Sequence, residues 1–520
     1  MIRRLVFWLG AILTTAVSAA EKSLPPILSD EIASPAAPGA VGAALFAAPD
    51  GIVWLTWVEP GATAQPQPMA EHHHGAEAAP VDAPPNTLRF SAFDAAAKKW
   101  RAARTVAVGH GVPASSADFP QLVVDARGRA TIVWADGHGR AFLSTSADRG
   151  ATWSAPAPVT RESNEVEKFS LAVLADGRVL AAWLDARAKK SGPPTGADAA
   201  QAAGNAEQLY ARVVGDPGPD TLVDPSVCDC CQTTLTAFPD GTALLAYRGR
   251  TTEEVRDIRV ARFRAGAWDE PRTLNHDDWR INACPINGPR LASDGGRVAA
   301  AWFTAADNEP RVLASFSPDA GARFLMPLRI DRGQPAGHVD TLILHDGALL
   351  VTWTENDGSV WLRRITPDFS ADEPVALTPA GTVSTRVVPR LALVRDYVGG
   401  HTPAEFVAAF ATERGLRTLR VSVPEGELLD AEKTCDCTPS AEQRQGYPLR
   451  GTIVAAQPAS ESVRVKIFEL PGVFAAGPRE FKVARETLAT LPANRAFLGR
   501  VERRDGEWWL FDVRLLVEAK

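Results

Sequence analysis

Cysteine is the residue type that gives this chain its clearest capacity for chemistry. The 520 residues include six cysteines, five of which lie in two short runs that each begin Cys-Asp-Cys. Thiolates form disulfides with one another or bind soft metal ions, so their grouping decides which chemistry is open to them. The six are Cys228, Cys230, Cys231, Cys284, Cys435 and Cys437.

Three interpretations of the cysteines are open. An even number in an exported chain favours disulfides. A Cys-x-Cys pair is too short for an unstrained internal bridge, so the first run needs a distant partner such as Cys284. Alternatively, the first run and Cys284, with a histidine, form a soft thiolate site suited to copper or zinc. Free or redox-active thiols are the third interpretation.

A histidine run offers a second group of metal ligands. His72, His73 and His74 lie within residues 59–86, a segment rich in Pro, Ala and Gly. Such a run is either solvated linker or a tract that captures copper, nickel or zinc. We expect this segment on the same face as the cysteines, which strengthens the metal interpretation without excluding the linker.

Polar and aromatic residues accompany the cysteines on that face. They come from the connection that carries Cys284 and from the expected starts of inner strands. Arginines at such positions bind anions or pair with carboxylates within the fold. The candidate binding residues are Asp277, Trp279, Arg290 and His338.

The cysteines are set within a repeated unit, in which two apolar runs are joined by a turn and the second ends in an aromatic residue. Asp-Gly between such runs is a strong hairpin signal, because the tight turn needs positive φ. From Trp134 onward the aromatic ends are 49 to 64 residues apart, which fits one four-stranded sheet per repeat. The seven aromatic ends are Trp57, Trp134, Trp183, Tyr247, Trp302, Trp353 and Phe410.

This period predicts an all-β fold, a seven-bladed propeller with six blades as the alternative. Residues 59–86 and 185–208 both interrupt the repeat after a second strand. They therefore lie on one face, together with the connections from each outer strand to the next inner strand, where the cysteines occur. In one unit we expect strands at residues 121–124, 130–134, 141–145 and 157–160. Residues 24–30 or 428–431 are expected to complete the last blade.

One turn carries a family signature. Residues 146–153 read S-x-D-x-G-x-x-W, with a weaker copy at residues 317–324. The pattern resembles the Asp-box, or BNR repeat, of sialidase-like propellers. In that family the turn lies on the face away from the site. The resemblance therefore implies the fold over most of residues 40–430 and implies no activity.

The residues required for sialidase activity are not evident. The family implies three arginines that clamp a carboxylate, one of them early in the chain, together with a tyrosine nucleophile. No arginine occurs between Arg4 and Arg89, where the family has its early motif. The four tyrosines fall in expected strands, a turn and the start of the last domain: Tyr210, Tyr247, Tyr397 and Tyr447.

After the second cysteine run the repeat stops, and five short strands predict a small OB-like barrel. Residues 446–516 resemble the CusF-like periplasmic copper-binding barrel family, with its YxLxGxV and IPG-type patterns. Ile467 stands where that family has its copper-binding histidine. The other ligand positions fall on Phe474, Gly477 and Arg479. The barrel therefore lacks the donors that select copper(I), and metal handling rests on the cysteine face.

The ends and charge indicate an exported chain. Residues 1–20 combine a basic start, an apolar stretch and a small-residue cleavage site, which predicts a signal peptide. Its removal leaves 53 basic and 62 acidic residues, a net charge of −9, so nucleic acid is not an expected partner. No later apolar stretch is long enough to cross a bilayer.

We therefore expect residues 21–434 to form the propeller, 435–445 a cysteine-containing linker and 446–520 the barrel. The predicted function is a periplasmic or extracellular, non-catalytic binding or accessory protein that handles copper or another soft metal through its cysteine face. The alternative is an exo-sialidase or other glycoside hydrolase. A disulfide-stapled interaction scaffold, with a protein or glycan partner, is the third hypothesis.

Overall fold

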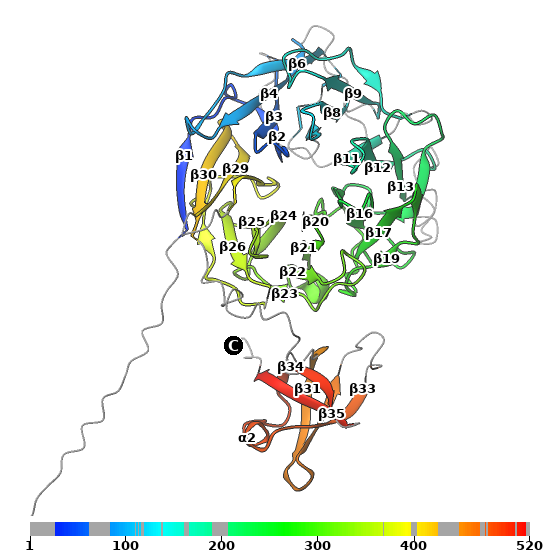
Figure 1. The fold of residues 1–520 in the computed structure, drawn as a ribbon, viewed down its shortest axis with the longest axis vertical. Helices are drawn as coiled ribbons and strands as arrows, with labels where there is room; N and C mark the ends of the chain where they lie inside the picture. The colour runs from blue at the N-terminus through cyan, green and yellow to red at the C-terminus, as the bar shows by residue number, and fades with distance from the viewer. Residues whose placement is uncertain are drawn as a thin grey trace, which may run out of the picture.

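The computed structural model describes the chain in several stretches. They are residues 27–61, 84–109, 111–112, 114–115, 119–136, 139–160, 166–189, 206–367, 369–396, 403–424, 447–467, 474, 477–504 and 507–515. Within them the chain forms seven antiparallel sheets of four or five strands and one closed barrel. The seven sheets are arranged in a ring, as in a β-propeller (Figure 1).

Six of the seven sheets run outward from the centre of the ring in chain order, and in the seventh β1 is the outermost strand, next to β30 (Figure 1). The strands are β1 (Leu28–Ile32), β2 (Val41–Ala47), β3 (Val53–Glu59), β4 (Asn86–Asp94), β5 (Lys99–Trp100), β6 (Arg104–Gly109), β7 (Gln121–Val124), β8 (Ala130–Ala135), β9 (Ala141–Ser146), β10 (Ala157–Pro158), β11 (Val166–Val173), β12 (Val179–Asp185), β13 (Glu207–Val213), β14 (Thr221–Val227), β15 (Thr234–Ala237), β16 (Ala243–Arg248), β17 (Ile258–Arg264), β18 (Ala267–Trp268), β19 (Arg272–Thr273), β20 (Arg290–Asp294), β21 (Arg297–Thr304), β22 (Arg311–Ser317), β23 (Leu328–Arg329), β24 (Pro335–Ile343), β25 (Leu349–Glu355), β26 (Val360–Ile365), β27 (Val375–Ala376), β28 (Arg390–Arg395), β29 (Ala404–Thr412) and β30 (Gly415–Val423).

The Asp-Gly turns form as expected. Gly177 has a φ of 86°, and the Asp176 carboxylate accepts the backbone N–H of Arg178 at 2.9 Å. The turn at Asp240 repeats this contact with the N–H of Thr242, also at 2.9 Å. The strand order predicted for residues 121–160 is confirmed by the pairing of β7, β8, β9 and β10.

The Asp-box also forms the predicted turn. The N–H of Gly150 donates to Ser146 Oγ at 2.7 Å, and the N–H of Thr152 donates to Asp148 Oδ1 at 2.9 Å. Gly150 has positive φ, and an added Cβ would lie 2.4 Å from the Phe90 ring. The turn lies between β9 and β10, the end of the sheet opposite the outer-to-inner connections.

The aromatic residues at the ends of the second strands form the core between neighbouring sheets. Trp57, Trp183, Trp302 and Trp353 are fully buried. In three sheets a carboxylate two residues further on accepts the indole N–H, as Asp185 does from Trp183 at 3.0 Å. This local pair satisfies a polar group that burial would otherwise leave without a partner.

The ring is closed by its N-terminal strand. β1 pairs antiparallel with β30, from Leu28 opposite Ser422 to Ile32 opposite Thr418. Strands from the two ends of the ring region therefore share one sheet with β28 and β29. Residues 24–26 and the competing segment 428–431 lie outside the described residues.

The second unit is the closed barrel, with sheet order β31-β32-β33-β35-β34. Ile467 is buried in its core, and Phe474 packs edge-on against Phe481 and Trp508 with ring centroids 5.5 and 4.8 Å apart. Two of the positions compared with copper ligands thus hold apolar contacts, and at a third the Arg479 guanidinium lies 5.8 Å from the Phe474 ring centroid. Its strands are β31 (Tyr447–Gln457), β32 (Ser462–Ile467), β33 (Gly477–Lys482), β34 (Ala496–Arg504) and β35 (Glu507–Leu515).

Helical structure is limited to short pieces in the described chain. They are η1 (Ala306–Asn308), η2 (Pro458–Ser460) and α2 (Arg485–Leu488). None of these described helices is long and apolar enough to span a membrane.

Candidate thiol and metal site

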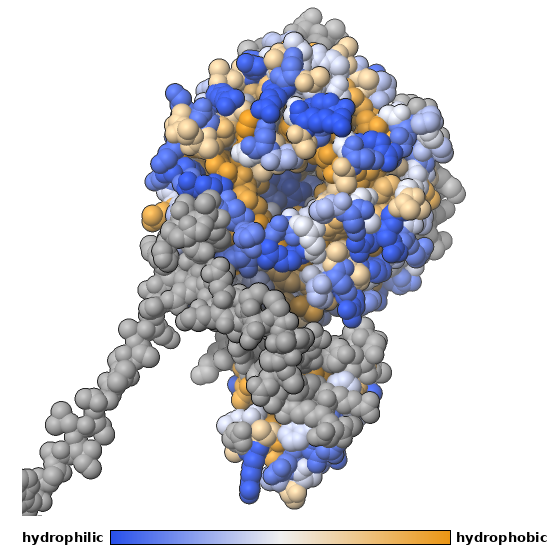
Figure 2. Space-filling model, viewed as in Figure 1, coloured by the Kyte–Doolittle hydropathy of each residue, from blue (hydrophilic) through white to orange (hydrophobic). Residues whose placement is uncertain are grey.

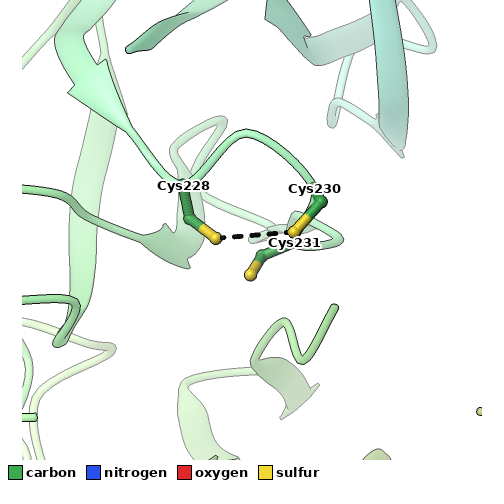
Figure 3. A group of neighbouring side chains, drawn as sticks. All are labelled: Cys228, Cys230 and Cys231. Carbon is green, nitrogen blue, oxygen red and sulfur yellow. Dashed lines mark hydrogen bonds between the residues drawn. The ribbon is translucent and has the colours of Figure 1, made fainter. Parts of the chain in front are cut away.

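Three connections on one face of the ring bring the first cysteine run and Cys284 together. The run lies between β14 and β15, and Cys284 lies between β19 and β20. The hairpin between β16 and β17 supplies the third connection. The sulfur atoms of Cys228, Cys230 and Cys231 lie within 4.8 Å of one another, and Figure 3 shows them gathered at one place.

One disulfide joins two of these connections. Cys230 is bonded to Cys284 across 54 residues of sequence. A distant partner at Cys284 was expected from the short Cys-x-Cys spacing, and this is confirmed. The disulfide also agrees with the oxidising compartment that the predicted signal peptide implies.

Cys228 and Cys231 remain free thiols, and both are buried. The Cys228 sulfur lies 4.0 Å from the Cys230 sulfur (Figure 3). Burial alone would raise the pKa of Cys228, but the hydrogen bond from Cys231 and the charges of Arg256 and Arg248 lower it to about 6. Burial and the neighbouring thiolate raise the pKa of Cys231. These shifts favour a thiolate on Cys228 beside a protonated thiol on Cys231.

Two arginines supply the positive charge around this pair. Arg256 Nη1 donates to the Cys228 sulfur at 3.5 Å. Arg248 is buried, and its guanidinium donates to the backbone carbonyls of Asn287, Arg256 and Phe303 at 2.7 to 2.8 Å. These bonds fix the guanidinium in place without neutralising it, so its charge favours an anion in the cysteine cluster.

The aspartate inside Cys-Asp-Cys anchors the run. Asp229 Oδ1 accepts the backbone N–H of Glu207 at 3.0 Å. Arg250 and Lys189 lie 3.3 and 3.4 Å from its other oxygen. The aspartate therefore anchors the turn between the two cysteines through contacts that do not involve their sulfurs.

The two connections approach so closely that one position requires glycine. A Cβ on Gly288 would lie 1.9 Å from the carbonyl oxygen of Gln232. The N–H of Gly288 donates to Gln232 Oε1 at 3.3 Å. This contact seats the second connection against the residue that directly follows the cysteine run.

Two predicted binding residues lie inside the structure. Asp277 accepts the indole N–H of Trp302 at 2.7 Å, the contact that a carboxylate two residues after the tryptophan makes in other sheets. Burial raises the pKa of this carboxylate. Trp279 is buried, with the Arg248 guanidinium 4.8 Å from its ring centroid. Their contacts within the protein account for both residues.

Arg290 lies on β20 and His338 on β24, the innermost strands of two neighbouring sheets. Arg290 Nε donates to Asp340 Oδ1 at 2.8 Å. His338 is buried, and burial together with the charge of Arg386 lowers its pKa to about 4. Arg390 is also buried, and neither its Nε nor its Nη1 has a hydrogen-bond partner. Among the described residues, the side-chain contacts of Arg290 and Arg390 are with Asp340 and Phe119 and not with the cysteine cluster.

A second group of possible metal ligands lies beside the cluster. Oxygen or nitrogen atoms of Asp257, His276 and Asp278 lie within 4.8 Å of one another. Asp257 is already engaged, because its carboxylate accepts the backbone N–H groups of Asp278 and Trp279 at 3.0 Å. The predicted ligands His72, His73 and His74, and the cysteines Cys435 and Cys437, lie outside the described residues.

A small cavity adjoins the cysteine run. Its lining includes Phe119, Lys168, Gln232 and Thr233, and its volume is about 20 Å³. That is room for about one water molecule.

On the face shown in Figure 2 the ring is hollowed at its centre.

Sequence reasoning missed the arginines that face the thiols. Arg248 and Arg256 belong to the β16 end and the following hairpin, which carry no cysteine. The one signal that pointed to this place was the Cys-x-x-Cys spacing of Cys228 and Cys231, which is typical of paired, reactive or metal-binding thiols and so of a site that needs positive charge nearby. It was hidden behind the overlapping Cys-x-Cys and vicinal pairs.

Comparisons with known proteins give low similarity. No protein-family model matches the chain, and no curated protein sequence does. Among solved structures, the BP39L lectin from Burkholderia pseudomallei is similar to it, with 10% identity and a TM-score of 0.48 over 74% of this chain and 99% of the lectin.

Two enzymes give further matches. The NanB sialidase from Streptococcus pneumoniae has 11% identity and a TM-score of 0.39 over 77% of this chain and 70% of its own. A polysaccharide lyase described as an ulvan lyase has 10% identity and a TM-score of 0.40 over 62% and 78%. At such values the function has to be derived from the residues of this chain.

Proposed function

We propose that this protein is an exported, non-catalytic binding protein, a seven-bladed propeller followed by an OB-like barrel, that holds a soft metal ion at its cysteine cluster. Copper(I) is the first candidate and zinc the second. One observation carries the proposal: three buried sulfur atoms converge within 4.8 Å, and those of Cys228 and Cys231 are free thiols.

Copper(I) suits the two free thiols. It is a soft ion that accepts thiolate ligands, whereas structural zinc is almost always bound by four ligands. Two thiolates and one copper(I) ion give a complex of net charge −1. The Arg248 guanidinium, which donates only to backbone carbonyls, offsets that negative charge in the buried site. Arg256, 3.5 Å from the Cys228 sulfur, adds to it although it also pairs with Glu254 at 2.8 Å.

Hydrolysis by a tyrosine nucleophile is less well supported. Tyr247 is buried, and its hydroxyl donates to Asp224 Oδ2 at 2.6 Å. Burial and the charge of Asp224 raise the pKa of this phenol, which is the opposite of activation. Tyr210 packs beneath the Arg187 guanidinium, 3.9 Å from its ring centroid. Glycoside hydrolysis therefore ranks behind binding.

A stapled interaction scaffold is the remaining alternative. The Cys230–Cys284 disulfide supports it, because the bond joins two connections on the face where propellers place their binding sites. In that case the two free thiols have no ligand, and the partner is a protein or glycan.

The experiment is an anaerobic titration of the mature protein with copper(I) against a competing chelator, without disulfide reductant. We expect one copper per chain, and loss of that copper in the Cys228→Ser and Cys231→Ser variants. A Cys435→Ser, Cys437→Ser double variant controls for cysteines outside the cluster and should keep it. Wild-type protein without copper, or with copper that survives both cluster variants, would overturn the proposal.

A further inference from the structure

The disulfide occupies the sulfur atom that would complete the metal site. Cys230 contributes one of the three clustered sulfur atoms, yet it is bonded to Cys284. Its sulfur is 4.0 Å from that of Cys228, a separation that fits two ligands of one ion. The structure thus has two free thiols, Cys228 and Cys231, and a third, masked donor, the Cys230 sulfur, which the disulfide keeps from binding a metal.

The masked donor can be reached from one side. Cys228, Cys230 and Cys231 are buried, whereas Cys284 is exposed on the connection between β19 and β20. A thiol of another molecule therefore meets Cys284 first. Access decides which sulfur of a disulfide is attacked.

We propose that the Cys230–Cys284 disulfide is a redox gate on the metal site, opened by an external dithiol protein that attacks Cys284. The inference rests on the metal function proposed above and adds its regulation and a class of partner. Opening converts the two-thiol site of Cys228 and Cys231 into a three-sulfur site that includes Cys230.

The exchange balances as two successive displacements. A thiolate of the partner attacks the Cys284 sulfur, which forms a mixed disulfide, breaks the bond to Cys230 and releases Cys230 as a thiolate. The second thiolate of the partner then attacks its own half of the mixed disulfide and releases Cys284. The partner becomes a disulfide, two electrons pass to this protein, and the freed sulfurs take up protons or metal.

The cluster is built to survive this opening. Asp229 is held by the backbone of Glu207 and by the side chains of Arg250 and Lys189, none of which involves the disulfide. The Cys228 N–H also donates to the Arg248 carbonyl at 3.0 Å. These contacts keep the cysteine run in place, so Cys230 is released next to the other two sulfurs.

An internal exchange is the competing reaction. Attack of Cys228 on Cys230 would close a Cys-x-Cys ring, whose short span strains the bond. Exchange with an external dithiol avoids that product. Peptide mapping of the oxidised and partly reduced protein distinguishes the two reactions.

The test uses full-length mature protein carrying Cys435→Ser and Cys437→Ser, so that only four cysteines remain. The protein is treated with dithiothreitol as the dithiol, desalted anaerobically and titrated with copper(I) against a chelator. We expect two additional titratable thiols and at least ~10-fold tighter copper(I) binding after reduction. Adding Cys284→Ser should give the tight site without any reductant.

A matched variant separates the third donor from loss of the staple. Cys230→Ser with Cys284→Ser also lacks the disulfide but lacks the third sulfur, so its affinity should stay at the oxidised value in both conditions. Equal affinity in oxidised, reduced and Cys284→Ser protein would overturn the gate while leaving the metal function standing. Absence of copper from every form would overturn the metal function, even if dithiothreitol opens the disulfide.

Discussion

At the scale of single residues, position among charges distinguishes the two free cysteines. Cys228 and Cys231 are both buried, and Arg256 donates a hydrogen bond to the sulfur of Cys228. The pKa of Cys228 is lowered because its thiolate accepts a hydrogen bond from the Cys231 thiol and lies near two arginine charges. The pKa of Cys231 is raised by its burial and by the same neighbouring thiolate, which the Cys231 thiol donates to and whose charge opposes a second ionisation. A site with a thiolate at Cys228 and a neutral thiol at Cys231 is suited to a soft cation.

Replacing Arg256 should raise the pKa of Cys228. In Arg256→Gln the guanidinium charge is lost while a polar side chain remains, so the thiolate becomes less favourable and its titration midpoint moves upward from about 6. The measurement is a pH titration of the ultraviolet thiolate absorbance of the reduced and oxidised protein. Arg264→Gln, which removes an exposed arginine paired with Asp269 at 2.8 Å, is the control. An unchanged midpoint would show that Arg256 does not set this pKa.

At the scale of elements, the site is formed by contacts between connections rather than by any single strand. The β14–β15 and β19–β20 connections are joined by the disulfide and by the contact of Gly288 with Gln232. The end of β16 adds Arg248, and the connection from β16 to β17 adds Arg256. Each sheet supplies rigid strand ends from which these connections start.

Substituting Gly288 should disturb the contact between the β14–β15 and β19–β20 connections. In Gly288→Ala the new Cβ would lie 1.9 Å from the Gln232 carbonyl oxygen, so the connections must separate. We expect a loss of roughly 1–3 kcal/mol in the free energy of unfolding, measured by urea denaturation. We also expect incomplete formation of the Cys230–Cys284 bond, measured by thiol counting. Gly296→Ala, where nothing lies within 4 Å of the added Cβ, should behave as wild type.

The elements were largely predictable from sequence because their signals are local. Asp-Gly turns, the Asp-box and the alternation of strands each depend on residues a few positions apart, and the strands at residues 121–158 appear where expected. The contacts of the site are not local. The partner of Asp277 is Trp302 and that of Cys284 is Cys230. The sequence therefore offered Asp277 as a ligand contact, and it left open which cysteine of the first run bonds to Cys284.

At the scale of the whole molecule, closure of the ring keeps these connections in register. The first strand, β1, completes the sheet formed by β28, β29 and β30, so the ring is closed by pairing between distant parts of the chain. A closed ring leaves fewer free strand edges and resists opening at any one sheet. The cysteine cluster, drawn from neighbouring sheets, depends on that rigidity.

Removing β1 should weaken the whole ring. A protein that starts at residue 33 loses five residue pairs with β30 and the ion pairs of Glu31 with Arg417 and Asp30 with Arg420. It also exposes the backbone groups of β30, a free edge that can pair with another molecule. We expect a lower urea midpoint and self-association, measured by circular dichroism and analytical ultracentrifugation. The Asp30→Asn, Glu31→Gln variant keeps the strand and should lose only ~0–1 kcal/mol per pair, because exposed ion pairs contribute little. A truncated protein that stays monomeric and unfolds at the wild-type urea concentration would show that β1 does not close the ring.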